Sequence, residues 1–159
     1  MKVLIIYDSF FGNTEQIAYA IGNALGSGED VGTFRVSGVK IEQLTGLELL
    51  IVGSPTRGFR PTQAITGFLK RISNNDLKGV KVAAFDTRIS TSDIESSALR
   101  FLVKIGGYAA KRIADRLKKS GGTLIMPPEG FFVKDKEGPL KEGELERAVD
   151  WATQIITKQ

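Results

Sequence analysis

Residues 3–26 read VLIIYDSFFGNTEQIAYAIGNALG, and this stretch decides the fold. Its first part, Val3 to Tyr7, is a continuous apolar run, which predicts a strand buried on both faces. A polar segment with a glycine follows, and from Ile17 onward apolar residues recur at helical spacing until Gly26. A buried strand that leads through a short polar loop into a helix is the start of an α/β arrangement.

The same alternation continues along the rest of the chain. Further apolar runs predict strands at residues 32–36, 47–53, 80–85 and 123–126, and a run at 131–133 beyond Pro127-Pro128 extends the last one. Helical stripes occupy residues 61–72, 110–117 and 145–156. This order predicts an α/β fold, a doubly wound three-layer sandwich around a five-stranded parallel sheet. We expect one domain over residues 1–159, since no repeat or linker interrupts the pattern.

The connection from residue 88 to residue 106 is longer than this scheme needs. Its second half carries a helical stripe of its own, formed by Ala98, Phe101, Leu102 and Ile105. Two interpretations remain open. The stripe is either an extra short helix beside the site or an extension of the next helix that Gly106-Gly107 breaks.

The composition excludes several kinds of chemistry. The chain has no cysteine and no histidine, which removes disulfides, thiolate nucleophiles, iron–sulfur ligation and histidine bases. We expect no metal site and no catalytic side chain, and any redox chemistry must come from a bound organic cofactor. The net charge of +4 is compatible with nucleic acid or an acidic partner protein, but Lys and Arg are scattered among acids rather than gathered in one tract, which is the pattern of an ordinary solvated surface of mixed charge and does not indicate nucleic acid.

The apolar runs are too short for a membrane or a secretion signal. None approaches the roughly 20 residues that a membrane span requires. The opening run is also shorter than a signal-peptide core and lacks a cleavage site of small residues. We therefore expect a cytoplasmic protein without membrane contact.

The loop after the first strand has the chemistry of a phosphate cradle. Residues 8–14 supply hydroxyls, an amide, a glycine and the N–H groups of a helix start, without any Lys or Arg. Neutral donors and the helix dipole can hold a dianionic phosphate, although an ordinary Ser/Asn-capped helix has the same pattern. The chain lacks G-x-x-x-x-G-K-[ST] and has no G-x-G-x-x-G after its first strand, so a P-loop and a dinucleotide site are both disfavoured.

Two motifs carry a resemblance to a known family. The segment Tyr7-Asp8-Ser9-Phe10-Phe11-Gly12-Asn13-Thr14-Glu15 resembles the phosphate-binding loop of flavodoxins. Val52-Gly53-Ser54-Pro55-Thr56-Arg57-Gly58 resembles the second flavin loop of the same superfamily, in a form similar to that of quinone reductases and flavodiiron proteins. The resemblance covers the whole chain in element order and length. It implies strand order 2-1-3-4-5 and one FMN held non-covalently by three loops at the carboxyl ends of the sheet.

The resemblance assigns cofactor contacts to three loops. They are Ser9, Phe10, Phe11, Gly12, Asn13 and Thr14 in the first, Pro55, Thr56, Arg57, Gly58 and Phe59 in the second, and Asp86, Thr87 and Arg88 in the third. Ser9, Asn13 and Thr14, with the backbone around Phe11 and Gly12, are expected to hold the phosphate. Gly58 is either the candidate for a backbone flip at flavin N5 or an ordinary turn position that needs a positive φ.

This chain departs from the family pattern at two points. Phe11 stands where many flavodoxins carry another hydroxyl, and the third loop offers no aromatic residue to stack on the flavin. Phe59 either stacks on one face of the ring, with Arg88 or Ile89 on the other, or anchors the following helix in the core.

The arginines of the second and third loops also allow two interpretations. Arg57, Arg60 and Arg88 either stabilise the anionic reduced flavin or a bound acidic substrate, or pair with a local acid such as Asp86 or Asp93.

The sequence favours an electron carrier that serves redox partner proteins with an acidic docking face. Two alternatives remain, an NAD(P)H-dependent FMN quinone reductase and a flavin-free module that mediates interactions.

Overall fold

The computed structural model describes residues 1–26, 28, 30–90, 97 and 108–158. Its strands are β1 (Val3–Tyr7), β2 (Val31–Arg35), β3 (Leu49–Pro55), β4 (Lys81–Ile89), β5 (Thr123–Leu124) and β6 (Glu129–Val133). Its helices are α1 (Asn13–Leu25), α2 (Gln63–Arg71), α4 (Ala109–Lys119) and α5 (Glu144–Thr157), with short 3-10 turns η1 (Val36–Gly38) and η2 (Ile41–Leu44). The extra helix considered for the 88–106 connection lies outside the described residues.

The strands form one parallel sheet in the order β2-β1-β3-β4-β5, which confirms the predicted fold class and strand order. The fifth position is filled by two separate pieces. β5 pairs with β4 at Lys81 and Val82, whereas β6 pairs with it from Phe85 to Ile89. Because β6 supplies partners at that end, β4 continues as a strand to Ile89, through residues that the sequence predicted as a loop.

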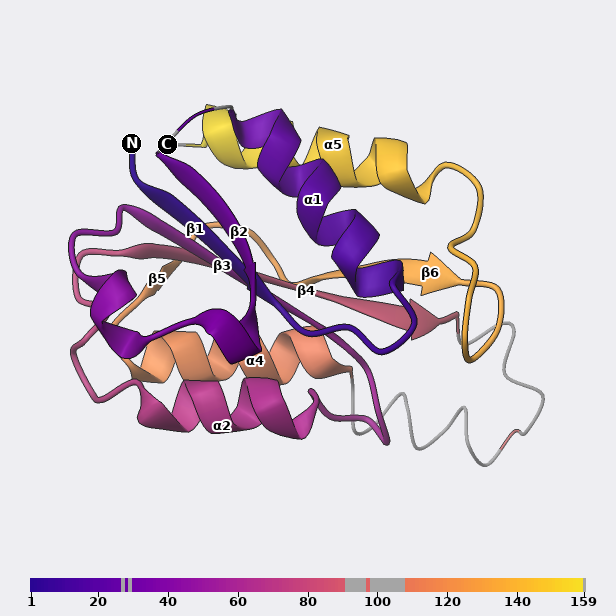
Figure 1. The fold of residues 1–159 in the computed structure, drawn as a ribbon, viewed down its shortest axis with the longest axis horizontal. Coiled ribbons are helices and arrows are strands. Elements are labelled where there is room, and N and C mark those ends of the chain that lie inside the picture. The colour runs from indigo at the N-terminus through magenta and orange to yellow at the C-terminus, as the bar shows by residue number, and fades with distance from the viewer. Residues whose placement is uncertain (27, 29, 91–96, 98–107, 159) are drawn as a thin grey trace.

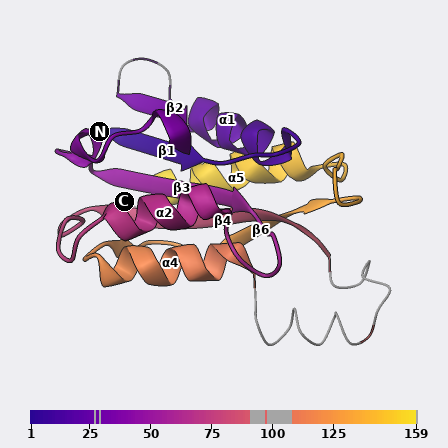
Figure 2. The ribbon, with the colours of Figure 1, turned by 60° about the horizontal axis from the view of Figure 1, so that its bottom comes forward.

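Helices cover both faces of the sheet, with α1 and α5 on one face and α2 and α4 on the other (Figures 1 and 2). Strand side chains alternate between the faces, so two hydrophobic cores form. Leu50, Val52 and Phe68 belong to the core beneath α2 and α4, while Ile51 and Phe85 belong to the core beneath α1 and α5.

Trp151, on α5, is deeply buried, with 4% of its surface exposed. Its ring makes edge-to-face contacts with Phe85 and Phe131, at centroid distances of 6.2 and 6.1 Å. This aromatic cluster stabilises the packing of α5 against β4 and β6.

Helix α2 begins later than predicted. The sequence placed Pro61 in its first turn, but the helix starts at Gln63 with Thr62 as the N-cap. The Thr62 side chain accepts a hydrogen bond from the Ile65 N–H at 3.3 Å, so the cap sets the start of the helix.

In the described ranges, no helix has both the length and the apolar character needed to cross a membrane.

Candidate functional site

The loop between β1 and α1 presents backbone N–H groups toward the carboxyl edge of the sheet. Gly12 is the N-cap of α1 and has a φ of 89°, a conformation that glycine adopts without strain. The first backbone hydrogen bond of the helix runs from the Gln16 N–H to the Gly12 carbonyl at 3.1 Å. The N–H groups of the first helical turn, from Asn13 to Glu15, therefore lack helical acceptors and can bind an anion. A Cβ at Gly12 would meet no described atom within 4 Å, so the space above this turn is open.

Side chains around this turn add neutral donors. The Ser9 hydroxyl accepts from the Gly12 N–H at 3.1 Å, which leaves its own hydrogen available for a ligand. The hydroxyls of Thr14 and Thr87 lie 2.8 Å apart, so one donates to the other and the second retains a free hydrogen. Asn13 donates one amide hydrogen to the Glu137 carbonyl at 3.1 Å and keeps the other.

Arg35, at the end of β2, fixes the conformation of this loop. Its guanidinium donates to the Ser9 carbonyl at 2.7 Å and to the carboxylates of Asp8 at 3.4 Å and Glu15 at 3.2 Å. Glu15 also accepts from the Tyr7 hydroxyl at 2.6 Å, and burial together with this bond raises the pKa of the Tyr7 phenol. The one acid in the first turn of α1 is thus engaged by Tyr7 and Arg35 beside the cradle.

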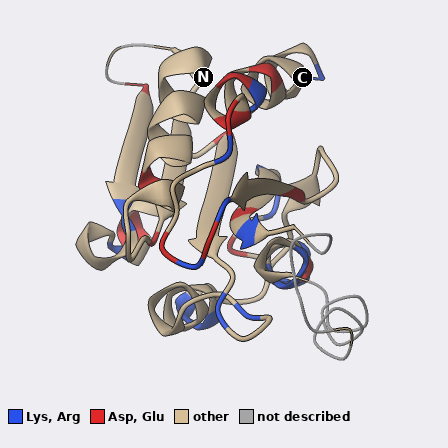
Figure 3. Cartoon of the chain, turned by 90° about the vertical axis from the view of Figure 1, so that its right-hand side faces the viewer, with Lys and Arg blue, Asp and Glu red and all other residues tan. Residues whose placement is uncertain are grey.

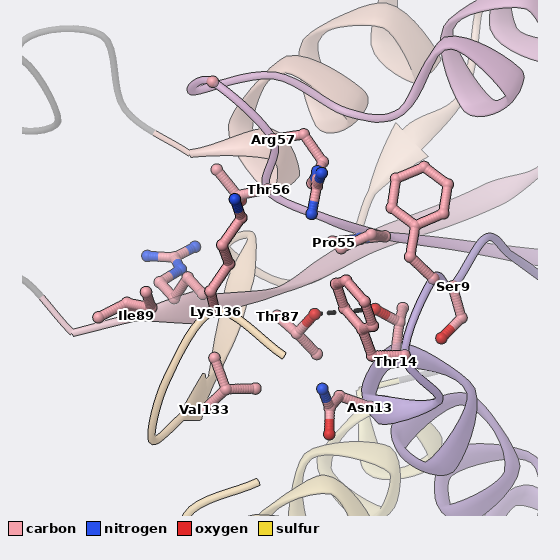
Figure 4. Close-up of a pocket in the computed structure, with 14 residues that line it drawn as sticks. Ser9, Asn13, Thr14, Pro55, Thr56, Arg57, Thr87, Ile89, Val133 and Lys136 are labelled. Atoms are coloured by element: carbon pink, nitrogen blue, oxygen red, sulfur yellow. Dashed lines mark hydrogen bonds between the residues drawn. The ribbon is translucent and has the colours of Figure 1, made fainter. Parts of the chain in front are cut away.

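The cradle opens into a cavity of about 320 Å³, which lies within the size range of small-molecule sites. The cavity is lined by residues from all three predicted loops and from the β6–α5 connection (Figure 4). The lining comprises Ser9, Phe10, Phe11, Asn13, Thr14, Pro55, Thr56, Arg57, Gly58, Thr87, Arg88, Ile89, Val133 and Lys136. Of the predicted cofactor residues, Gly12, Phe59 and Asp86 are not part of this lining.

The second loop is a tight turn with an unusual backbone. The N–H groups and carbonyls of Arg57 and Arg60 bond reciprocally at 2.8 and 3.0 Å, which encloses Gly58 and Phe59 as the central residues. Both have positive φ, 55° for Gly58 and 67° for Phe59, as a type I′ turn requires. A bulky side chain in this region is strained by about 1–2 kcal/mol, so Phe59 is held against its own preference.

The third segment divides its residues between two faces because it is a strand. Thr87 points toward α1, where it meets Thr14, and Asp86 points to the α4 side. Asp86 is fully buried and accepts from Arg88 at 2.6 and 2.8 Å and from the Ala110 N–H at 2.8 Å. Burial raises the pKa of the Asp86 carboxyl, although Arg88 favours its charged form. The predicted alternative of pairing with a local acid is therefore confirmed for Arg88.

The positive charges at the cavity differ from those that the sequence predicted. Arg57 lines the cavity, with its guanidinium 5.0 Å from the Phe10 ring centroid. Arg88 also lines it, but its charge is matched by Asp86. Arg60 lines a neighbouring depression instead. Lys136 adds a cation that the sequence analysis missed.

Val133 is the last residue of β6, and Lys136 lies in the connection between β6 and α5. The rule that ligands bind at the carboxyl ends of parallel strands applies to the fifth strand as well. This rule could have predicted that both residues lie at the cavity. The same rule points to Arg35, since β2 neighbours β1 in the predicted order. Tyr108 was also missed, and its ring lies 3.7 Å from the Arg88 guanidinium at the start of α4.

These observations fit a ligand that carries a phosphate monoester. The donors at the α1 turn are neutral and preorganised, and the open space lies directly above glycine backbone. The adjoining cavity has mixed character, since Pro55, Ile89 and Val133 lie beside the cationic side chains. The fold and the site are together those of a doubly wound α/β protein with a neutral anion cradle at its carboxyl edge.

The chain belongs to the flavodoxin family, whose model matches residues 5–151. A curated flavodoxin from Clostridium beijerinckii is 37% identical over 84 residues, which are 51% of this chain and 60% of that protein. The match therefore spans less than two thirds of this relative's length.

Solved structures resemble the fold over its full length. Oxidised Flavodoxin 2 from Bacillus cereus has a TM-score of 0.76 and 26% identity, and the match covers 100% of both chains. A flavodoxin from the domain Archaea has a TM-score of 0.75 and 24% identity, covering 99% of this chain and 98% of that one.

Proposed function

We propose that this protein binds one FMN non-covalently in the cavity and carries electrons between partner proteins. The observation that supports this most directly is the neutral cradle at the start of α1, continuous with a cavity lined by the other two predicted loops. Flavodoxin is the family of the chain, and FMN is the cofactor that the resemblance implies. When bound, FMN supplies the one- and two-electron chemistry that a chain without cysteine or histidine requires from a cofactor.

The side chains of this protein have distinct tasks in the proposal. Ser9, Asn13 and Thr14 donate to the phosphate, and Arg35 keeps their loop in the binding conformation. Arg57 and the turn at Gly58 border the ring-binding part of the cavity.

The charge around the cavity sets the expected reduction potential. Arg57 and Lys136 favour the anionic reduced flavin electrostatically. We therefore expect a reduction potential less negative than that of an acidic relative, to be checked by spectroelectrochemical titration. Partner proteins would present an acidic face, since the net charge is +4.

The first experiment compares FMN with riboflavin, which lacks the phosphate. The visible absorption spectrum reports bound flavin, and calorimetric titration gives both affinities. Ser9→Ala and Thr14→Val should each weaken FMN binding about tenfold or more, because each removes a donor to a charged group. Riboflavin affinity should change little. Ser37→Ala, at an exposed position in η1, is the matched control.

Each outcome of this experiment is informative. If the wild-type protein retains neither flavin, the cofactor proposal is wrong and the interaction-module alternative gains support. If FMN binds, anaerobic addition of NADPH or NADH without a partner tests the reductase alternative. Rapid bleaching of the flavin would favour an enzyme, and a slow or absent reaction would favour a carrier.

A further inference from the structure

A basic groove leads away from the mouth of the cavity along α2 and α4. One depression, of about 570 Å³, shares Phe10 and Arg57 with the cavity and extends to Arg60 and Lys70. A second, of about 250 Å³, shares Arg60 and Lys70 and extends to Arg112 and Arg116. We call these two depressions the basic groove. It is continuous with the cavity because neighbouring depressions have residues in common.

The groove carries one sign of charge. Among the described residues that line it, none is acidic. Figure 3 shows Lys and Arg on both helices of this layer and on the loop that leads into α2. The one acid on α4 is Asp115, which pairs with Lys111 at 2.9 Å and Lys118 at 3.7 Å rather than with the groove.

Two arginines of the groove are held in position by backbone carbonyls. The Arg112 Nε–H donates to the Phe59 carbonyl at 3.1 Å, and the Arg116 Nε–H donates to the Leu69 carbonyl at 3.4 Å. These bonds use the inner nitrogen and leave the terminal amino groups for a ligand. Within the described part of the chain, neither arginine forms an ion pair, so two oriented cations lack a counter-charge.

We propose that the basic groove binds a run of carboxylates on a protein partner, with Arg112 and Arg116 as the main contacts. This inference rests on the proposed function for the role of that partner as a redox protein. The binding of carboxylates itself follows from the groove. A partner bound there is adjacent to Phe10 and Arg57, where the groove meets the cavity, so electrons can enter or leave at that mouth.

Geometry matches a peptide with alternating acids. Arg112 and Arg116 are four residues apart on one helix, which places them about 6 Å apart along its axis. Alternate side chains of an extended peptide are separated by about 6.6–6.8 Å. Arginine binds carboxylates through two parallel hydrogen bonds. Exposed aromatic rings at Phe10 and Phe11 add the mixture of aromatic residues and arginine that is typical of protein interfaces.

Single-stranded nucleic acid fits the groove less well. Proteins that bind it combine a positive channel with aromatic platforms on which successive bases stack. Between Arg60 and Arg116 the described lining consists of aliphatic, hydroxyl, amide and cationic groups, and its aromatic residue, Phe10, lies at the cavity end.

The test measures binding of a fluorescein-labelled octaglutamate peptide by anisotropy at low and moderate salt. The double variant R112Q/R116Q should weaken the binding roughly five- to tenfold. The variant K40Q/K158Q removes the same charge from exposed positions outside the groove and should change it less than about twofold. R112K/R116K keeps the charge but loses the paired guanidinium hydrogen bonds, so it should restore only part of the binding. Thermal unfolding of each variant confirms that it is folded.

Two outcomes would overturn the proposal. Equal losses of peptide affinity in R112Q/R116Q and K40Q/K158Q would mean that the binding depends only on the net charge of the protein. Tighter binding of an oligothymidylate of equal charge, with the same dependence on Arg112 and Arg116, would assign the groove to nucleic acid. Flavin absorbance is recorded in parallel on every variant. A wild-type protein without flavin would refute the proposed function while the peptide data still decide the role of the groove.

Discussion

Replacing Arg88 by methionine should expose how much the buried ion pair contributes to the sheet edge that carries the site. Asp86 is 0% exposed, whereas the Arg88 side chain is 18% exposed. R88M leaves a carboxylate in the interior whose remaining partners, among the described residues, are the Ala110 N–H and Thr56. Removing one member of such a pair costs several kcal/mol, and we expect a loss of about 3 kcal/mol in the free energy of unfolding.

Removing the other member of the pair, in D86N, should lower the free energy of unfolding by less. In D86N the amide oxygen can still accept from the Ala110 N–H, and the partly exposed Arg88 can recruit water. We expect a loss of about 2 kcal/mol. The double variant D86N/R88M should lose less than the sum, with a coupling of about 1–2 kcal/mol.

The deficit of R88M should also depend on pH. Burial already raises the pKa of Asp86, and loss of the guanidinium raises it further. A carboxyl whose pKa is higher in the folded state contributes most stability below its unfolded pKa, and this contribution is lost as pH rises through the folded pKa. R88M should therefore be closer to wild type at about pH 4 than at about pH 7.

The assay is urea unfolding of the flavin-free protein, followed by the fluorescence of Trp151, which is the single tryptophan and is buried. Bound flavin is avoided because a ligand of the folded state raises apparent stability. An unchanged m-value keeps the comparison valid. Losses below about 1 kcal/mol in both single variants, with no coupling between them, would refute the reasoning.

Three further predictions use the same titration. Gly53→Ala places a Cβ 2.0 Å from the Phe85 ring and should cost about 1–3 kcal/mol; a neutral result would mean that the ring moves freely. Phe59→Asn relieves the positive φ of 67° and should raise stability by about 1 kcal/mol; a loss would show that packing of the ring outweighs the strain. For Glu144, burial raises the pKa, but hydrogen bonds from Arg147 and the Phe132 N–H outweigh it and hold the pKa below 4.5. Its contribution is present above that value and lost as pH falls, so E144Q should flatten the acid limb of stability against pH.

Local sequence patterns were sufficient to place most of the strands and the first two loops, whereas the strand order was implied by the resemblance to flavodoxins. The buried strands are apolar without alternation, and the turn at Gly12 and the cap of α1 depend on residues adjacent in the chain. The second loop was also predictable in position, since it follows directly after the apolar run of β3. These features require little information from distant residues.

Other features depend on contacts between distant segments. The extension of β4 to Ile89 requires β6, which follows some forty residues later. Lys136 reaches the cavity because its loop packs against α1, where the Asn13 amide binds the Glu137 carbonyl across 124 residues of sequence. Asp86 points away from the cavity because residue 86 lies in a strand, where side chains alternate between the two faces, whereas the sequence predicted a loop there. Sequence patterns of short range carry no information about such pairings.

The divided fifth strand has a consequence for association between molecules. A sheet edge with unpaired N–H and carbonyl groups can template another chain. On the β5–β6 edge the two short pieces are separated by Pro127 and Pro128, which have no N–H to donate, so this edge offers no continuous template. The other edge is β2, a run of five residues with a partly exposed Phe34. In the described structure, strand-to-strand aggregation would therefore start at β2, and a charged residue at position 34 is the substitution that would oppose it.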